Sequence, residues 1–376
     1  MISDYTCQVS QSAIDDLKSR IRNTRWTDEI EHSGWQYGAC LSYMKELAEY
    51  WLNGFDWRKV EKEINQYPNY IADIDGTKIH FIHIKGKGKK SMPLIITHGW
   101  PGSFLELMKL ITPLTTNPKF SFDLIIPSIP GFGFSQKVTM PGCNLWFIGD
   151  LWSKLTRELG YDKVLAQGGD FGAGVSTAFA LKHPDQLLGL HLNYIPGSYI
   201  PYLPANEKFS EEELLSRKDV DDWYINEGAY IHQQKTKPLT LAYGLNDSPV
   251  GLLAWIVEKM YGWSECNGNI ESVFTKDELL ANVSLYWFTE TIHSSIRLYN
   301  ENSKVPLHFS KNDFVHTPVG IARFHKEEPF PARKFIERGY NIQHWTDFPK
   351  GGHFAAMEQP ALLANDIMQF AKTLNL

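Results

Sequence analysis

Hydrophobic residues in the first 70 positions recur at the intervals of amphipathic helices. Ser12 is predicted to cap the N-terminus of the first helix. A second amphipathic run covers 41–51 and is predicted to end at Asn53-Gly54, since glycine is a common residue just after a helix. The apolar positions of the first helix that share this spacing are Ile14, Leu17, Ile21 and Trp26.

The period of the pattern changes to two after Tyr67-Pro68-Asn69-Tyr70. Residues 71–84 alternate around Asp75-Gly76, a dipeptide that favours the tight turn of a β-hairpin. From position 93 onward, short apolar runs alternate with helical patterns, which predicts a mostly parallel sheet with helices on both faces. The predicted strands are 93–97, 122–127, 164–167 and 187–194, and the predicted helices are 104–114, 145–159 and 170–183.

The segment from about 195 to 300 has a different texture, being mostly helical and rich in tryptophan and tyrosine. Alternation returns after Val305, and a helix over 361–374 closes the chain. We therefore predict an α/β fold in two parts: a helical N-terminal arm over 1–90, and a core over 91–376 interrupted by a helical cap at about 195–300.

Composition excludes several classes of function. The 376 residues are 43% hydrophobic and 21% charged, typical of a globular protein, and the net charge of −6 argues against a nucleic-acid partner. The pattern predicts neither a transmembrane helix nor a secretory signal, so a cytoplasmic location is expected. The four cysteines have no paired spacing and are predicted to be free thiols: Cys7, Cys40, Cys143 and Cys266.

The sharpest local motif is Gly168-Gly169-Asp170-Phe171-Gly172, between a predicted strand and a predicted helix. It has the form of a nucleophile elbow, with Asp170 at the nucleophile position and the N-terminus of the helix favouring its ionised carboxylate. The alternative is a glycine-rich turn in which Asp170 only caps the helix.

Two further motifs favour the nucleophile interpretation. The loop His98-Gly99-Trp100-Pro101 follows an earlier strand, where a backbone N–H of Trp100 could join that of Phe171 in an oxyanion hole. Gly351-Gly352-His353 comes late in the chain, where the order of nucleophile, acid and histidine requires the base.

An aspartate nucleophile narrows the chemistry to electrophilic sp³ carbon, because attack there gives an ester that water can hydrolyse. Epoxides and alkyl halides are the expected substrates, and tyrosine hydroxyls suit the protonation of an epoxide oxygen. Two alternatives remain open: a haloalkane or haloacid dehalogenase, with Trp100 and Trp223 as halide donors, and a non-catalytic ligand receptor that kept the pocket.

The motifs together resemble the microsomal-type epoxide hydrolases, including the juvenile-hormone epoxide hydrolases. The resemblance covers nearly the whole chain and implies the α/β-hydrolase fold, with Asp170 as nucleophile and His353 as the base. The segments that carry it are HGWPGS (98–103), PGFGFS (130–135), GGDFG (168–172), LNDSPVGLLAWIVEK (245–259) and GGHFAAMEQP (351–360).

The resemblance also implies the remaining site residues. The acid carries over to Glu327, with Glu328 next in line because His325 stands where the family commonly has proline, and with Asp313 as a weaker candidate. The two tyrosines that activate the epoxide carry over to Tyr230 and Tyr299.

The resemblance implies no cofactor and no metal, and it gives a small apolar epoxide and water as the reactants. Mammalian members begin with a membrane anchor, which is not expected here. The N-terminal arm is one candidate surface for a homodimer.

Overall fold

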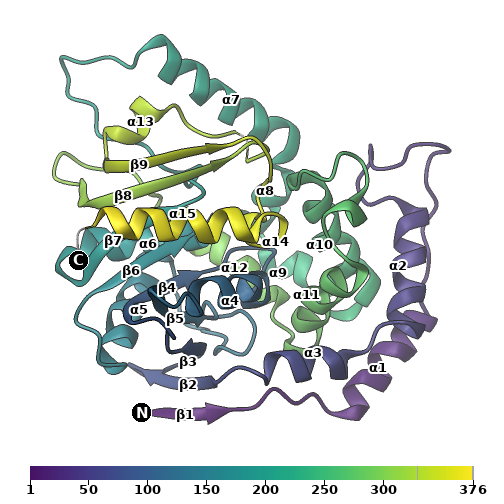
Figure 1. The fold of residues 1–376 in the computed structure, drawn as a ribbon. Helices are drawn as coiled ribbons and strands as arrows, with labels where there is room; N and C mark the ends of the chain where they lie inside the picture. Colours follow the sequence, from purple (N-terminus) through teal and green to yellow (C-terminus); the bar gives the residue numbers. More distant parts are fainter. Residues whose placement is uncertain (328, 375–376) are drawn as a thin grey trace.

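The computed structural model describes residues 1–327 and 329–374 and contains one mixed nine-stranded sheet (Figure 1). The strand order is β1-β2-β3-β5-β4-β6-β7-β8-β9. In this order, the pairs from β1 to β5 are antiparallel. The pairs β5–β4, β4–β6, β6–β7, β7–β8 and β8–β9 are parallel. The strands are β1 (Ile2–Tyr5), β2 (Asn69–Ile74), β3 (Thr77–Ile84), β4 (Lys90–Thr97), β5 (Phe120–Pro127), β6 (Val164–Gly168), β7 (Leu187–Leu192), β8 (Val315–Phe324) and β9 (Tyr340–Phe348).

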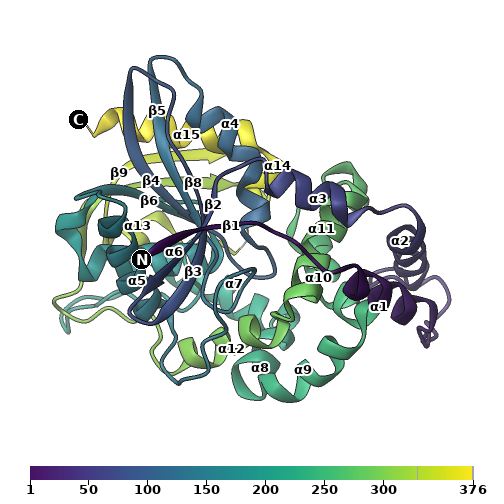
Figure 2. The same cartoon turned by 90° about the horizontal axis from the view of Figure 1, so that it is seen from below.

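Helices cover both faces of the sheet, as predicted. Figure 2 shows α4 and α15 on one side and α5 and α6 on the other. The central strands are buried on both faces and are continuous apolar runs, as in Leu94-Ile95-Ile96 of β4. The helices of the core are α4 (Ile111–Thr115), α5 (Leu145–Glu158), α6 (Asp170–Lys182), α13 (Arg333–Glu337), α14 (Ala355–Glu358) and α15 (Pro360–Thr373), with 3₁₀ turns at Phe104–Leu110 (η1) and Pro184–Gln186 (η2).

The predicted hairpin is confirmed. Strands β2 and β3 pair antiparallel in a register that closes on Ile74 and Thr77. The two residues between them, Asp75 and Gly76, have φ angles of 51° and 78°. Two successive positive φ angles are what a tight turn between twisted strands requires, and aspartate followed by glycine tolerates them.

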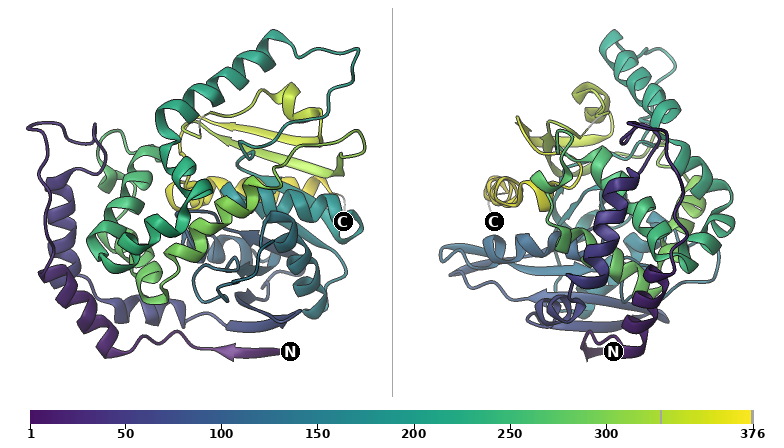
Figure 3. Two further views of the ribbon diagram at one scale, coloured as in Figure 1. Left: turned by 180° about the vertical axis from the view of Figure 1, so that it is seen from behind. Right: turned by 90° about the vertical axis from the view of Figure 1, so that its right-hand side faces the viewer.

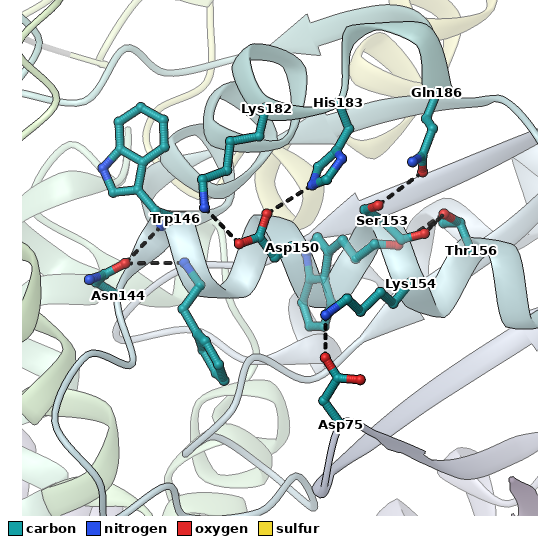
Figure 4. A network of polar contacts seen from close by, with 12 residues as sticks. Asp75, Asn144, Trp146, Asp150, Ser153, Lys154, Thr156, Lys182, His183 and Gln186 are labelled. Atoms are coloured by element: carbon teal, nitrogen blue, oxygen red, sulfur yellow. Dashed lines mark hydrogen bonds and ion pairs between the residues drawn. The ribbon is translucent and has the colours of Figure 1, made fainter.

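A network of polar side chains fixes α5 against the end of α6 and against this hairpin (Figure 4). Asp150 of α5 accepts from Lys182 at 2.6 Å and from His183 at 2.8 Å. Lys154, one turn later, forms an ion pair with Asp75 at the tip of the hairpin. These contacts lie on the surface, so each contributes little stability, but together they fix the orientation of α5.

The cap is inserted between β7 and β8, and Figures 1 and 3 show its helices lying beside the sheet, with α7 extending along the β8–β9 edge. The cap bounds of about 195–300 stay a prediction. The cap contains α7 (Glu211–Glu227), α8 (Ala229–Thr236), α9 (Pro238–Asp247), α10 (Pro249–Trp263), α11 (Lys276–Thr289) and α12 (Ile292–Ser303), with a 3₁₀ turn at Ile270–Ser272 (η3).

The N-terminal region contains α1 (Gln11–Arg22), α2 (Leu41–Asn53) and α3 (Trp57–Ile64), in addition to β1, β2 and β3. The predicted cap residue is wrong: Ser10, not Ser12, accepts from the backbone N–H of Ala13 and begins α1.

Two other elements differ from the sequence prediction. Strand β1 was not predicted, because its four residues are at most half-buried and show no alternation. The segment 104–114 begins as a 3₁₀ turn and becomes α-helical only at Ile111.

Across residues 1–327 and 329–374, no helix combines the length and the apolar character needed to cross a bilayer. All four cysteines are free thiols, as predicted.

Candidate active site

Asp170 lies at the turn between β6 and α6, as the elbow motif predicts. It is the first residue of α6 and has a φ of 47°, a strained value for a residue with a side chain. The turn is possible only with small neighbours: a Cβ on Gly172 would lie 1.9 Å from the carbonyl oxygen of Thr97, and one on Gly99 would lie 2.3 Å from the Asp170 carboxylate. The glycines therefore allow the strained backbone and the close approach of the neighbouring loop.

Two backbone donors contact the Asp170 carboxylate. The N–H of Trp100 donates to Oδ1 at 2.8 Å, and the N–H of Phe171 also stabilises the ionised form. Burial raises the pKa of Asp170 above its ordinary value, and these two donors and the positive charge of His353 oppose the rise. Both predicted oxyanion-hole donors are thus at the nucleophile, although in the free protein they bind the carboxylate itself.

His353 connects Asp170 to Glu327. Its Nε2 lies 3.7 Å from Asp170 Oδ2, and its Nδ1 lies 3.1 Å from both carboxylate oxygens of Glu327, which is 5% exposed. The backbone N–H of His353 donates to Trp263 of the cap at 3.0 Å and fixes the loop. This order of carboxylate, imidazole and carboxylate is that of a catalytic triad.

The electrostatics of the triad favour a charged imidazole in the free protein. Burial lowers the pKa of His353, but the charge and hydrogen bond of Glu327, followed by the charge of Asp170, outweigh the effect of burial and raise the pKa to about 9. The other acid candidates do not replace Glu327. Asp313 accepts from the backbone of Ser310 in a turn before β8, and Glu328 lies outside the described residues.

The two predicted tyrosines come from different cap helices. Tyr230 lies on α8 and Tyr299 on α12, with ring centroids 5.9 Å apart, and their hydroxyl groups interact. The indole of Trp100 stacks on Tyr230 at 5.5 Å and meets the ring of Tyr299 edge-on at 5.7 Å. Burial, together with the nearby charge of Asp170, raises the pKa of both hydroxyls well above the ordinary value, so both remain hydrogen-bond donors.

A cavity of about 590 Å³, which we call the front cavity, extends from Asp170 and His353 to the surface. Tyr230, Trp263 and Trp223 line its inner walls. Charged residues also line the cavity, among them Asp219 and Asp222 of α7, Arg323 at the end of β8, and Lys326 just after it. Tyr299 does not line this cavity and lies instead against Trp100 and Phe171.

A second, much smaller cavity of about 20 Å³ touches Asp170 and His353 away from the front cavity. We call it the inner cavity, and it has room for about one water molecule. Gln167, Asn193 and Glu106 give it polar walls.

Sequence reasoning missed Glu106. Burial, helped by the negative charge of Asp170, raises its pKa to about 8. Its position three residues after Ser103 is also that of a helix-capping glutamate, so the pattern alone gave no signal of a role in the site.

Cap helix α11 fixes the loop that carries the Trp100 N–H. Asn282 donates to the carbonyl oxygen of Pro101 at 2.8 Å and accepts from the hydroxyl of Ser103 at 2.8 Å. Tyr286 donates to the carbonyl oxygen of Gly102 at 2.7 Å. The oxyanion-hole loop is therefore held by buried cap residues as well as by its own strand.

No group of three or more histidine, cysteine, aspartate or glutamate side chains within the described part of the chain is arranged to hold a metal ion.

Family models match two parts of the chain, and relatives match nearly all of it. The family model described as "Epoxide hydrolase N terminus" matches residues 2–107, and the model described as "alpha/beta hydrolase fold" matches residues 92–224. Over 401 aligned positions the chain is 37% identical to epoxide hydrolase 1 of Sus scrofa, and the alignment covers 98% of this chain and 88% of that protein.

Two solved structures agree over the whole chain. The juvenile hormone epoxide hydrolase of the silkworm Bombyx mori superposes with a TM-score of 0.87 at 30% identity, covering 100% of this chain and 94% of that one. The epoxide hydrolase of Aspergillus niger superposes with a TM-score of 0.87 at 28% identity, covering 100% and 97% of the two chains. The chain belongs to the epoxide hydrolase family and is an enzyme with the α/β-hydrolase fold.

Proposed function

We propose that the enzyme opens small apolar epoxides to vicinal diols through a covalent ester on Asp170. The observation that carries this proposal is the position of Asp170 beside His353 on the wall of the front cavity, which Tyr230 also lines. In the first step, a carboxylate oxygen of Asp170 attacks an epoxide carbon, and the carbon–oxygen bond of the ring breaks. The oxygen that leaves accepts a proton or hydrogen bonds from Tyr230 and Tyr299, whose hydroxyls remain protonated.

In the second step, His353 removes a proton from water, and the hydroxide attacks the ester carbonyl of Asp170. Glu327 stabilises the imidazolium that forms and holds the ring by its hydrogen bond to Nδ1. The N–H groups of Trp100 and Phe171 are positioned to stabilise the oxyanion, an effect worth about 3 kcal/mol per donor. As this intermediate collapses, the imidazolium of His353 gives its proton to the diol oxygen that leaves, and the carboxyl proton that came from water restores the tyrosine hydroxyl. The diol is released and Asp170 is again a carboxylate, with one oxygen now from water.

The test is product analysis of the purified enzyme with styrene oxide, a long-chain fatty epoxide and a chloroalkane. We expect diol from the epoxides, ¹⁸O from labelled water in Asp170 after repeated turnover, and loss of at least about 10³-fold activity in Asp170→Asn. Tyr230→Phe is the matched variant, because it removes a donor to the epoxide oxygen and leaves the triad intact. It should slow ester formation from epoxides selectively.

The alternatives give different results in the same experiment. Halide release without diol would identify a dehalogenase, and binding of the epoxides without product would contradict the proposed reaction. Diol formation with no label in Asp170 would contradict the covalent mechanism while leaving the activity itself in place. The cytoplasmic location and the homodimer stay predictions.

A further inference from the structure

A third cavity lies behind the site, among η1, α3, α10, α11 and α14. We call it the rear cavity; its volume is about 220 Å³ and its walls are mostly apolar, including Met108, Met260 and Ala281. Figure 2 shows α3, α11 and α14 near one another, and Figure 1 shows α7 at the top of the molecule, far from α3 and α11. None of the catalytic residues proposed above lines it.

The outer end of the rear cavity is polar and reaches solvent. Glu63, Lys109 and Glu278 contribute to its lining. Lys109 forms an ion pair with Glu278 at 2.5 Å, and these two side chains are 40% and 26% exposed. Charged, partly exposed side chains at an opening are hydrated, so water is available there.

The inner end of the rear cavity is formed by Glu106, which also lines the inner cavity beside Asp170 and His353. Phe354 is the other residue that the two cavities share. Gly102 leaves the space that the carboxyl group occupies, because a Cβ there would lie 1.8 Å from Glu106 Oε2. Glu106 and Phe354 therefore lie at the boundary between the water-sized inner cavity and the rear cavity.

The front cavity cannot easily supply water at the moment when water is needed. In the ester, the body of the substrate is attached to Asp170 and lies in the cavity that leads from Asp170 to the surface, so a bulky substrate leaves little room there for water. Each turnover nevertheless consumes one water molecule. A second route would make the rate of ester hydrolysis independent of how completely the substrate fills the front cavity.

We propose that the water that hydrolyses the ester enters through the rear cavity and passes the Glu106 carboxyl group into the inner cavity. This proposal rests on the covalent mechanism above. The carboxyl group suits the role because its raised pKa leaves it largely protonated at neutral pH, so it both donates to and accepts from a passing water molecule.

The test fills the rear cavity with Ala281→Phe, on the face of α11 that lines it, and uses Ala281→Ser as the matched control. Formation and breakdown of the ester are measured separately by rapid quench and mass spectrometry, with styrene oxide and with a bulky fatty epoxide. We expect the phenylalanine variant to form ester at the wild-type rate. Breakdown should slow at least tenfold with the bulky substrate and less with styrene oxide, and the serine variant should behave as wild type.

Equal breakdown rates in wild type and Ala281→Phe with the bulky substrate would overturn the rear route. Failure to detect ester in either protein would overturn the covalent mechanism, and the route with it, so the two failures are distinguishable. If Ala281→Phe does not fold, as judged by its thermal melt, Met108→Trp fills the same cavity from η1 and decides the matter by the same criteria.

Discussion

The protonation state of His353 connects the two steps of the proposed reaction. In the free enzyme the pKa of His353 is about 9, so the imidazole is charged at neutral pH. A general base must be neutral to accept a proton. Part of this elevation comes from the negative charge of Asp170. Esterification removes that charge, so the pKa of His353 falls and the neutral imidazole forms when water must be activated.

This argument predicts the pH dependence of ester hydrolysis. The rate should rise with pH as one proton leaves His353, with a midpoint below 9, measured by pH-jump of preformed ester. Glu327→Gln removes the largest contributions that raise this pKa, so its midpoint should shift further down. Its plateau should fall about 10²-fold or more, because the imidazolium loses its partner. A wild-type midpoint at or above 9 would contradict the argument.

For individual residues, the sequence identified site residues where the chemistry requires an unusual backbone conformation. Asp170 and His353 stand in glycine-rich loops, and the positive φ of Asp170 and the 98° φ of Gly351 show why glycines are needed there. Glu106 could not be identified in the same way. Its proximity to Asp170 and His353 arises only when η1, β6 and the loop after β9 meet in the fold.

The elbow between β6 and α6 is an element whose shape depends on the absence of side chains. Gly172→Ala would place a Cβ 1.9 Å from the carbonyl oxygen of Thr97, which is backbone of β4 and cannot rotate away. We expect a loss of about 3 kcal/mol in the free energy of unfolding, measured by urea denaturation. The control is Gly244→Ala on α9, where nothing lies within 4 Å of the added Cβ and a small gain is expected. Equal stability of the two variants would show that the elbow relaxes freely.

Elements with strong local signals were predictable, and elements defined by their partners were not. The β2–β3 hairpin follows from Asp75-Gly76, and α2 ends at Asn53, next to the glycine that the pattern indicated. Strand β1 exists because it pairs with β2, and its own four residues carry no alternation. The capping serine of α1 was misplaced by two residues, since Ser10 and Ser12 are equally good caps.

At the scale of the whole molecule, the N-terminal region joins the sheet to the cap. Its strands β1, β2 and β3 extend the sheet, and its helices pack against the cap, as the right-hand view of Figure 3 shows for α2. Trp51 of α2 donates to the hydroxyl of Ser284 on α11 at 2.9 Å, and Trp35 stacks on Tyr261 of α10 at 4.0 Å. These contacts make the first 90 residues part of one packed structure. A boundary between two parts of the chain at residue 90 therefore stays a prediction.

The contact between Trp51 and Ser284 predicts long-range coupling. The same helix α11 carries Asn282 and Tyr286, which hold the loop that presents the Trp100 N–H. Trp51 is 1% exposed, so Trp51→Ala should cost about 3–5 kcal/mol in the free energy of unfolding. Amide hydrogen exchange should increase in α2 and also in α11, and ester hydrolysis should slow, because the oxyanion-hole loop loses its fixed support.

The matched control is Trp26→Ala, since this indole is 40% exposed and its removal should change stability by less than about 0.5 kcal/mol. Exchange of the buried strand β4 reports on global unfolding and separates it from local loosening of the cap. If Trp51→Ala increases exchange in α2 alone and ester hydrolysis keeps its wild-type rate, the first helices do not support the oxyanion-hole loop. If exchange increases in α2 and α11 while β4 stays protected, the path from Trp51 through Ser284 and α11 to the Trp100 N–H accounts for how a segment remote from Asp170 affects its chemistry.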